Sequence, residues 1–246
     1  AASAANQARW RGFWQRSAEP SAPPPPWESG VASSVLKSVV ESGEVPVESF
    51  CTAVELGCGS GACTAFLAER GYTATGIDYA EEALEVARAR PLPEGCGPVA
   101  WVNADCFALI SDGVLAAGSV DFIFDQQCFH CLRTVDEGRG EARAVEVTRC
   151  LLRPGGLALV VVGNSQEPAW EPGPSVLSAA ELVSAFCGDE GGMHLVRMWE
   201  TRFDPSPNYE ERKGGYGGVE PLAWAALFRK PDPAGEASGG VIGPAA

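Results

Sequence analysis

Apolar residues gather along the middle of the chain in short runs that alternate with amphipathic stretches of helical length. Each run has the length of a β-strand, and the run at 157–162 is apolar throughout, as a strand buried on both faces would be. We therefore expect strands at residues 52–56, 72–77, 99–102, 120–124, 157–162, 194–201 and 222–228, and helices at 62–70, 81–90, 142–152 and 178–186.

Turn residues mark the ends of several of these elements. Gly71 closes the first helix, Pro91 stops the second, and Pro154-Gly155-Gly156 forms a turn before the strand at 157–162. The strict alternation of strands and helices favours a doubly wound α/β domain with a mostly parallel sheet covered on both faces. In such a sheet the ligand crevice lies outside the carboxyl ends of the first and fourth strands, where strand order reverses.

The two ends of the chain differ from this middle part. Trp10 and Trp14 stand four residues apart, which places both indoles on one face of a helix, and the prolines at 23–26 then impose an extended stretch. Residues 231–246 have the composition of a flexible tail. The chain therefore divides into an N-terminal segment (1–30), an α/β domain (31–230) and a tail (231–246).

Composition narrows the choice of partners. Hydrophobic residues make up 46% of the 246, and no apolar run approaches the roughly 18 residues that a membrane span needs. The 18 basic and 32 acidic residues give a net charge of −14, which repels phosphate backbones, although solubility alone also accounts for an acidic surface. We expect a small-molecule partner, no nucleic acid, no membrane and a monomeric chain.

The cysteines bear on the compartment. There are nine, an odd number scattered along the chain, and no signal peptide is visible. This pattern favours a reducing compartment, so we expect a cytoplasmic protein, or an organellar one if a targeting segment has been removed.

The richest pattern in the chain is the segment 54–62, Val-Glu-Leu-Gly-Cys-Gly-Ser-Gly-Ala, which ends the first strand and opens the first helix. Its glycines let the backbone approach a ligand and turn where a Cβ would clash. Asp78 ends the second strand about 20 residues after Gly57, where a carboxylate can hold ribose hydroxyls. Asp105 follows the third strand and can accept a hydrogen bond from an adenine amino group.

Two classes of cofactor fit such a loop. Gly57-x-Gly59-x-x-Ala62 also satisfies the dinucleotide pattern, which leaves an NAD-dependent oxidoreductase as an alternative. Glu55, directly before the loop, shifts the balance, because a carboxylate there suits a ligand with an ammonium and a sulfonium and repels a pyrophosphate. The whole set favours S-adenosylmethionine (SAM).

On these residues, and on Leu151-Leu-Arg-Pro-Gly-Gly156 before the fifth strand, the chain resembles class I SAM-dependent methyltransferases from about Trp10 to Phe228. The resemblance implies a Rossmann-like sheet of seven strands with the last one antiparallel. It also implies a cofactor site in which Glu55 stands at the loop entrance, Gly57, Gly59 and Gly61 line the methionine and ribose, Asp78 binds the ribose hydroxyls, and Asp105 and Cys106 flank the adenine. Tyr79, next to Asp78, is a further expected cofactor-binding residue.

Within that class the chain is similar to the thiopurine, thiol and halide methyltransferase group. The similarity rests on Trp10-x-x-x-Trp14, Pro26-Trp27-Glu28-x-Gly30, Phe122-Ile-Phe-Asp125 followed by Phe129, and Pro172-Gly-Pro174. It implies an N-terminal helical lid that caps the cofactor, with Trp14 and Trp27 in contact with it. The alternative is that the helical indoles simply pack on the sheet, the commoner fate of such pairs.

The segment after the fourth strand is expected to face the transferable methyl. We take Asp125 and His130 as candidate catalytic residues, Asp125 also as a cofactor-binding one, and Gln126 and Gln127 as amides that favour a polar organic acceptor. A thiol needs only a modest shift from its pKa of about 8.5 to be a thiolate, whereas an alcohol or an ammonium needs a base. His130 is a candidate base, with a structural histidine as the alternative. Methyl transfer to a small molecule, with sulfur favoured over nitrogen or oxygen, is therefore the expected function.

Other functions fit parts of the pattern. Cys128-x-x-Cys131 lacks a second pair at zinc spacing, so we expect no metal site, and arsenite bound by thiols is a minor alternative as acceptor. A protein lysine methyltransferase usually carries an Asn/Asp-Pro-Pro-Tyr-like tetrapeptide after the fourth strand, which this chain lacks. A non-catalytic SAM-binding interaction domain is the third alternative, and the intact loop with Asp78 and Asp105 argues against it.

Overall fold

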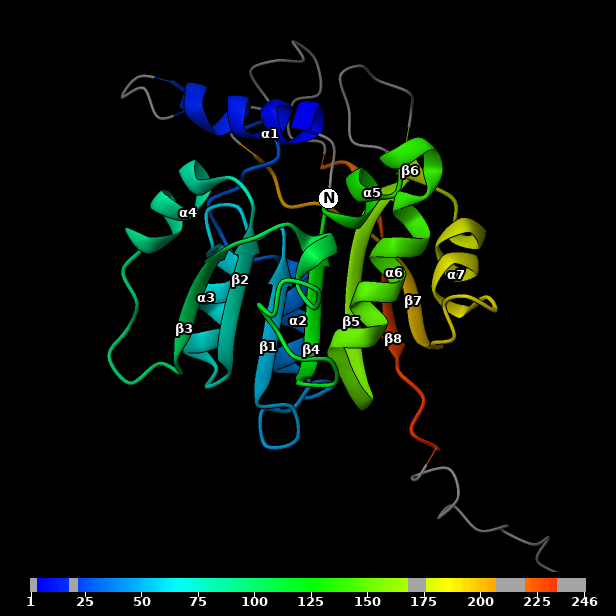
Figure 1. Cartoon of the computed structure of the whole chain (residues 1–246). Helices are drawn as coiled ribbons and strands as arrows, with labels where there is room; N and C mark the ends of the chain where they lie inside the picture. Colours follow the sequence, from blue (N-terminus) through cyan, green and yellow to red (C-terminus); the bar gives the residue numbers. More distant parts are fainter. Residues whose placement is uncertain (1–3, 18–21, 168–175, 207–219, 234–246) are drawn as a thin grey trace, which may run out of the picture.

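The computed structural model describes residues 4–17, 22–167, 176–206 and 220–233 (Figure 1). The helices are α1 (Ala4–Ser17), α2 (Ser34–Glu41), α3 (Ala62–Glu69), α4 (Glu81–Arg88), α5 (Phe129–Leu132), α6 (Gly140–Leu151) and α7 (Ala179–Cys187), with 3-10 turns η1 (Cys106–Ala108) and η2 (Asp136–Gly138). The strands are β1 (Thr52–Leu56), β2 (Thr73–Asp78), β3 (Val99–Asn103), β4 (Val120–Gln126), β5 (Leu152–Asn164), β6 (Val176–Leu177), β7 (His194–Arg202) and β8 (Leu222–Arg229).

Seven of these strands form one twisted sheet in the order β3-β2-β1-β4-β5-β8-β7. The last strand, β8, lies between β5 and β7 and runs antiparallel to both, while β1 to β5 run parallel to one another. The expected seven-stranded, Rossmann-like sheet with its last strand antiparallel is thus confirmed. The two-residue β6, which pairs with the end of β5 outside this order, was not predicted.

The structure differs from the sequence pattern at α2, which was not predicted, and at the turn expected before the fifth strand. The short helix α2 has Ser33 as its N-cap, whose side chain accepts from the Leu36 N–H, and it buries Val35, Leu36 and Val39. The expected turn at 154–156 lies instead within β5, opposite a register shift in β4. The N–H of Gly155, at a φ of 77°, donates to the carbonyl of Lys230, so pairing with the chain after β8 continues through the expected turn.

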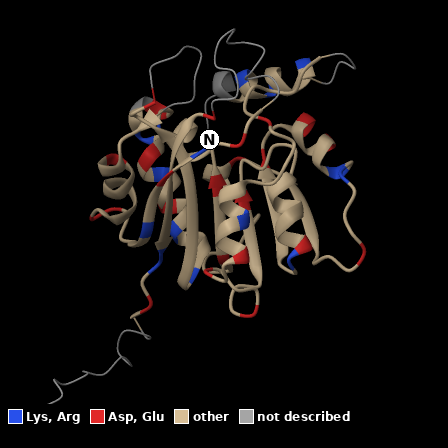
Figure 2. Ribbon diagram, turned by 180° about the vertical axis from the view of Figure 1, so that it is seen from behind, with Lys and Arg blue, Asp and Glu red and all other residues tan. Residues whose placement is uncertain are grey.

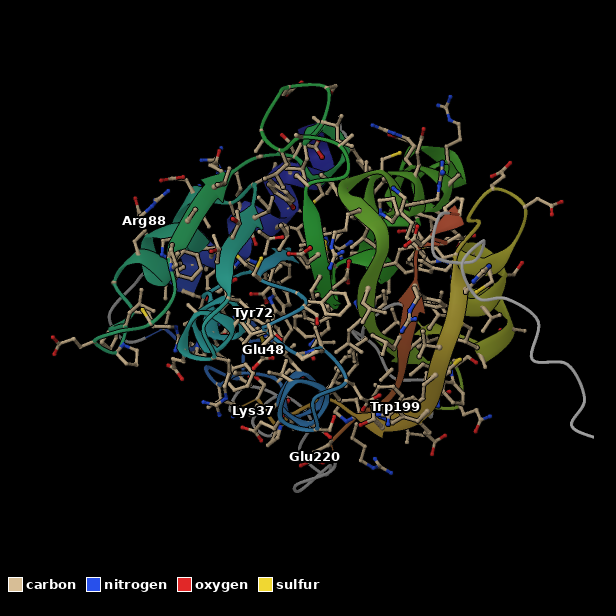
Figure 3. The ribbon with its side chains drawn as sticks, turned by 90° about the horizontal axis from the view of Figure 1, so that it is seen from below. Lys37, Glu48, Tyr72, Arg88, Trp199 and Glu220 are labelled. Carbon is tan, nitrogen blue, oxygen red and sulfur yellow. The ribbon has the colours of Figure 1, made fainter. Side chains whose placement is uncertain are left out.

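Each face of the sheet is covered by helices. One apolar core, with Ile123, Val160 and Phe129 among its members, lies under α5, α6 and α7. A second, on the other face, packs α2 and α3 against residues such as Phe122 and Leu159. Figure 3 shows this second side from below, with Lys37 of α2 and Trp199 of β7 labelled. Successive side chains of β4 and β5 point alternately into the two cores, so both faces of these strands are buried and their sequences are almost continuously apolar.

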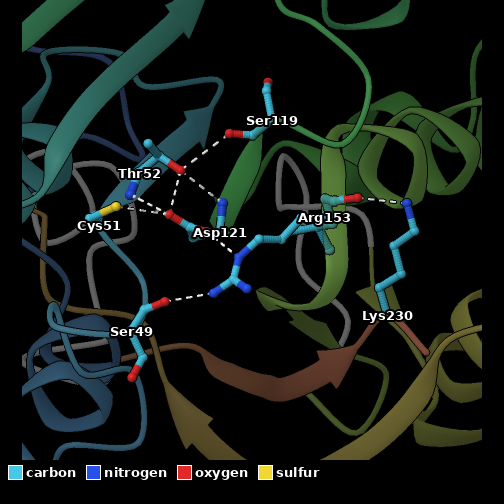
Figure 4. Close-up of polar contacts among 8 residues, drawn as sticks. Ser49, Cys51, Thr52, Ser119, Asp121, Arg153 and Lys230 are labelled. Atoms are coloured by element: carbon cyan, nitrogen blue, oxygen red, sulfur yellow. Dashed lines mark hydrogen bonds and ion pairs between the residues drawn. The ribbon is translucent and has the colours of Figure 1, made fainter. Parts of the chain in front are cut away.

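A polar cluster fixes the amino end of the central strands (Figure 4). Asp121 accepts hydrogen bonds from the Thr52 N–H at 2.8 Å and the Thr52 hydroxyl at 2.7 Å, and it also pairs with the Arg153 guanidinium. Arg153 reaches on to the carbonyl of Ser49 at 2.6 Å. This cluster joins β1, β4 and β5 at their amino ends. The carboxyl ends of the same strands, which form the opposite edge of the sheet (the carboxyl edge), are where a ligand is expected to bind.

The helix α1 crosses above that carboxyl edge and contacts α4 (Figure 1). Asp and Glu positions are interspersed with Lys and Arg positions over the ribbon, so the acidic excess is spread over the protein (Figure 2). Among the residues described, no helix is long and apolar enough to cross a membrane. Residues 234–246 of the expected tail and the Pro172-Gly-Pro174 motif lie outside the described residues.

Candidate active site

The Gly loop connects β1 to α3 at the carboxyl edge, next to the point where β1 and β4 pair. Gly57, Gly59 and Gly61 have φ angles of 69°, 52° and 74°, a region that residues with a Cβ rarely adopt. The N–H of Cys58 donates to the carbonyl of Ile77 at 2.9 Å, which joins the loop to β2. The predicted crevice position, between the ends of the first and fourth strands, therefore coincides with the loop.

The three glycines face different neighbours. A Cβ on Gly57 would lie 2.9 Å from the Cys128 Sγ, so the chain after β4 packs directly on the loop. A Cβ on Gly61 would lie 2.4 Å from the ring of Trp101. The backbone at Gly61 thus needs a glycine for packing as well as for its φ angle, and its role of lining the cofactor stays a prediction.

Glu55 lies beneath the loop and is only 6% exposed. Its Oε2 accepts hydrogen bonds from the N–H and the hydroxyl of Thr64, in the first turn of α3. Burial raises the pKa of Glu55 to about 8; the Thr64 hydrogen bonds lower it, and repulsion from Glu28 and Asp78 raises it. The carboxyl group expected at the loop entrance is therefore mostly protonated at neutral pH in the ligand-free protein.

Asp78 ends β2 and holds two backbone N–H groups. Its Oδ2 accepts from Gly59 at 3.0 Å and its Oδ1 from Ala80 at 2.9 Å, while burial raises its pKa. Each carboxylate oxygen has a second lone pair, so Asp78 can still accept from ribose hydroxyls. Tyr79 follows it, half-buried, and its carbonyl accepts from the Asn103 amide at 2.9 Å.

Asp105 and Cys106 stand where the third strand ends, as expected. The Asp105 Oδ1 accepts from the Phe107 N–H at 2.9 Å and caps η1, and the Cys106 side chain is buried. The structure thus brings both residues to the same edge of the sheet as Asp78, since β2 and β3 are parallel neighbours. Contact with an adenine ring stays a prediction.

The N-terminal segment covers the loop with one indole. Trp14 is 6% exposed, packs on Ala80, the N-cap of α4, and on Ala83 within that helix, and has its Cζ2 3.2 Å from the position of a Cβ on Gly59. Trp27 instead forms edge-to-face contacts with Trp10 and Phe13, at centroid distances of 5.0 and 4.9 Å. These aromatic rings hold the segment before α2 against α1.

Two polar side chains attach α1 to α4. The Arg11 guanidinium lies 3.0 Å from Glu82 Oε1, and the Gln15 amide donates to the same oxygen at 2.7 Å. The hydrogen bond from Arg11 is the main reason that the pKa of Glu82 is lowered to about 2. We call Arg11, Gln15 and Glu82 the lid latch.

Asp125 is a helix cap in this structure. Its Oδ1 accepts from the N–H groups of Cys128 at 3.2 Å and Phe129 at 2.9 Å, at the start of α5. Gln127, which lies between Asp125 and Cys128 in the chain, adopts a φ of 66°, a left-handed conformation that is uncommon for residues with a Cβ. Burial raises the pKa of Asp125 to about 7. The tight turn explains how Cys128 is aimed back at Gly57.

His130 lies in α5 and is 2% exposed. Its Nδ1 accepts from the Gly163 N–H at 3.3 Å, and its ring meets Phe203 edge to face. Burial lowers the pKa of His130 to about 4. The imidazole is therefore neutral at physiological pH, and its unprotonated nitrogen, Nδ1, already accepts the hydrogen bond from the Gly163 N–H.

Three residues of this site escaped the sequence analysis as individual contributors. Glu28 has its Oε2 3.5 Å from the Gly59 Cβ position, Trp101 fills the space that Gly61 leaves, and Cys128 contacts Gly57. Glu28 belongs to the quoted Pro26-Trp27-Glu28-x-Gly30 motif and Cys128 to the Cys128-x-x-Cys131 pair, whereas Trp101 carried no signal in the sequence. Among the residues described, no group of three His, Cys, Asp or Glu side chains is placed to hold a metal ion.

Comparison with known proteins shows which proteins this chain is similar to. Residues 53–156 match the family model described as a methyltransferase domain. The chain is 32% identical over 108 residues to the 2-heptyl-1-hydroxyquinolin-4(1H)-one methyltransferase of Mycobacteroides abscessus, covering 44% of each chain. It is 35% identical over 177 residues to the trans-aconitate 2-methyltransferase of Azoarcus sp., covering 65% of this chain and 64% of the relative. Less than two thirds of either relative is therefore matched.

The fold has a counterpart among solved structures over nearly its whole length. A protein solved in a study of the conversion of a disulfide bond into a thioacetal group during echinomycin biosynthesis superimposes with a TM-score of 0.71. The overlap covers 94% of both chains at 19% identity. At an identity this low, the superposition shows the shared fold alone.

Proposed function

Because the chain carries a class I SAM-dependent methyltransferase domain, we propose that it methylates a small polar organic acceptor that reaches the site already ionised, with a thiol favoured over nitrogen and oxygen acceptors. The observation that carries this proposal is how the two candidate catalytic residues, His130 and Asp125, are already hydrogen-bonded. The Nδ1 of His130 accepts the Gly163 N–H, and Asp125 Oδ1 accepts two N–H groups of α5. An acceptor that ionises without help is the one such a site suits.

The residues present fit the cofactor that this domain class uses. Asp78 keeps lone pairs for ribose hydroxyls, and Gly57 and Gly59 hold the loop at φ angles of 69° and 52° that residues with a Cβ rarely adopt. Trp14 stands over the loop and can shield a bound ligand from water. When bound, SAM supplies an electrophilic methyl group on its sulfonium.

The reaction needs alignment more than proton transfer. The acceptor lone pair forms the new bond to the methyl carbon as the sulfonium carbon–sulfur bond breaks, and that electron pair stays on the departing sulfur. Holding the two partners in line is what a positioned site contributes to such a displacement. The thiol pKa of about 8.5 makes a useful fraction of thiolate available near neutral pH.

An oxygen acceptor is the second candidate. The pKa of about 7 at Asp125 is close to that of an effective general base near neutral pH, although the side chain is 4% exposed. One relative is named for a hydroxyquinolone, and the other for trans-aconitate. If Asp125 loses its proton and releases one α5 contact, it can deprotonate a hydroxyl.

The test is a pH–rate series with acceptors of graded acidity. Aryl thiols, phenols, primary alcohols and amines are offered with SAM, and methylated products are measured by mass spectrometry. We expect thiols to react fastest, with kcat/KM rising through the pKa of each thiol in turn. Turnover of alcohols or amines but no thiol would overturn the proposal, and an inflection fixed near pH 7 that Asp125→Asn removes would support the oxygen alternative.

A further inference from the structure

The cofactor that we propose carries a positively charged α-ammonium group, and a carboxylate is the side chain that suits it. Glu55 and Asp78 are the acids that the sequence offers. Glu55 is largely protonated at neutral pH, since burial raises its pKa to about 8, and Asp78 already holds the backbone of Gly59 and Ala80. A third carboxylate near the loop would meet the need better.

Glu28 lies at that place. Its Oε2 is 3.5 Å from the position that a Cβ on Gly59 would take, beside the Trp14 ring at 3.2 Å from the same point. This oxygen accepts no hydrogen bond from any residue in the described part of the chain. A carboxylate and an aromatic ring on one side of a glycine form a pair that attracts a cation.

The Glu28 carboxylate is also held in place. Its Oε1 accepts the Gly30 N–H at 2.8 Å, which fixes the orientation of the side chain. Arg90 then ties this segment to the Gly loop, because it donates to the Gly30 carbonyl at 3.4 Å and to the carbonyl and hydroxyl of Ser60, each at 3.2 Å. A preformed carboxylate loses little freedom when it binds a charged partner.

From these contacts we infer that Glu28 is a cofactor-binding residue that receives the α-ammonium group of SAM and of S-adenosylhomocysteine (SAH). The inference rests on the proposed use of SAM. It assigns the recognition of the amino-acid end of the cofactor to the segment between the lid helix and α2, outside the residues 53–156 that match the methyltransferase domain.

The experiment compares two ligands and two variants by calorimetric titration. The ligands are SAH and its desamino analogue, which lacks only the α-ammonium group. The variants are Glu28→Gln, whose amide oxygen can still accept from Gly30, and Glu94→Gln, which removes the same charge from an exposed loop residue. Thermal unfolding of each variant confirms that it is folded.

We expect Glu28→Gln to weaken SAH binding by about tenfold or more, as for a lost hydrogen bond between charged groups, and to leave the desamino analogue unaffected. Glu94→Gln should match the unmodified protein with both ligands. An equal loss for both ligands, or no loss for SAH, would overturn the inference and leave the proposed function standing. Failure of the unmodified protein to bind SAH would overturn both.

A third ligand separates the ammonium from the sulfonium. SAM and SAH share the ammonium, but only SAM carries the positive sulfur. If Glu28 receives the ammonium, Glu28→Gln weakens SAM and SAH by the same factor. A loss confined to SAM would place Glu28 at the sulfonium instead and would contradict the assignment.

Discussion

The indole of Trp14 lies directly on Gly59: a Cβ at position 59 would come within 3.2 Å of the Trp14 Cζ2. The two residues are far apart in the chain, and their contact joins the lid helix α1 to the loop that ends β1. Any side chain at 59 must therefore displace the lid as well as adopt an unfavourable φ of 52°.

We expect Gly59→Ala to weaken SAH binding by roughly tenfold, because relief of about 1–3 kcal/mol of backbone strain would move the loop out of its binding geometry and the new Cβ would displace Trp14. Calorimetry measures the affinity. In Gly59→Ala/Trp14→Ala the steric part of the effect should disappear, so the double variant should be weaker than Trp14→Ala by the backbone strain alone. Equal SAH affinity for Gly59→Ala and the unmodified protein would show that the contact between Trp14 and Gly59 does not contribute to SAH binding.

The lid latch should control how often α1 leaves the loop. Glu82→Ala removes the partner of both Arg11 and Gln15, so we expect tryptic cleavage within α1 to accelerate and SAH affinity to fall by about twofold, since exposed ion pairs contribute little. Because the pKa of Glu82 is lowered to about 2, the latch should persist down to about pH 3. Glu85→Ala, on the exposed side of the same helix, is the control and should change neither rate nor affinity.

The packing of Gly61 on Trp101 predicts a large loss of stability for Gly61→Ala. Gly113 provides the matched control, because its φ of 68° resembles the 74° of Gly61 while a Cβ there would meet nothing within 4 Å. Denaturant unfolding should show Gly61→Ala to be less stable than Gly113→Ala by about 1–3 kcal/mol, the usual cost of overpacking. Trp101→Leu in the Gly61→Ala background should recover part of this loss. Equal stability of the two alanine variants would exclude the clash.

Glu55 predicts a pH dependence of folding. Its folded-state pKa of about 8 exceeds its ordinary value of 4.5, so the folded protein keeps a proton that the unfolded chain releases between these pH values. The free energy of unfolding should therefore decrease as pH rises from 4.5 to 8, by at most about 5 kcal/mol from this group. Glu55→Gln should flatten the slope, and Asp125, with a raised pKa of about 7, should leave a smaller slope of the same sign. A slope unchanged in Glu55→Gln would contradict this assignment.

The role of His130 can be separated from its packing. In His130→Asn the amide oxygen can replace Nδ1 as the acceptor for the Gly163 N–H, whereas His130→Ala leaves that buried N–H without a partner, at a cost of about 1–3 kcal/mol. We expect His130→Asn to keep turnover within a few-fold and His130→Ala to lose stability. If His130→Asn is stable but loses turnover by about a hundredfold, His130 acts as a base, as the sequence alone allows.

Much of the fold could be predicted because its signals are local. Apolar runs of strand length, Gly71 and Pro91 at helix ends, and the Gly loop at 57–61 each report on a few neighbouring residues, and the alternation of elements then leaves few topologies. The alternation of strands and helices also predicted that Asp78 ends the second strand and that the ligand crevice lies at the carboxyl ends of the first and fourth strands. The helix α2 was not predicted, although it is as long as α3 and α4 and its buried Val35, Leu36 and Val39 follow helical spacing.

The candidate site likewise has a part that local sequence signals predict and a part that they do not. The sequence by itself determined that Gly57, Gly59, Asp78 and Asp105 meet at the carboxyl edge, because parallel strands bring their ends together. Only the tertiary structure decided what touches them: Trp101 against Gly61, Trp14 and Glu28 over Gly59, and the Gly163 N–H on His130. These contacts depend on side-chain directions and on burial, which set both packing and pKa, and neither quantity is encoded in the local pattern of residues.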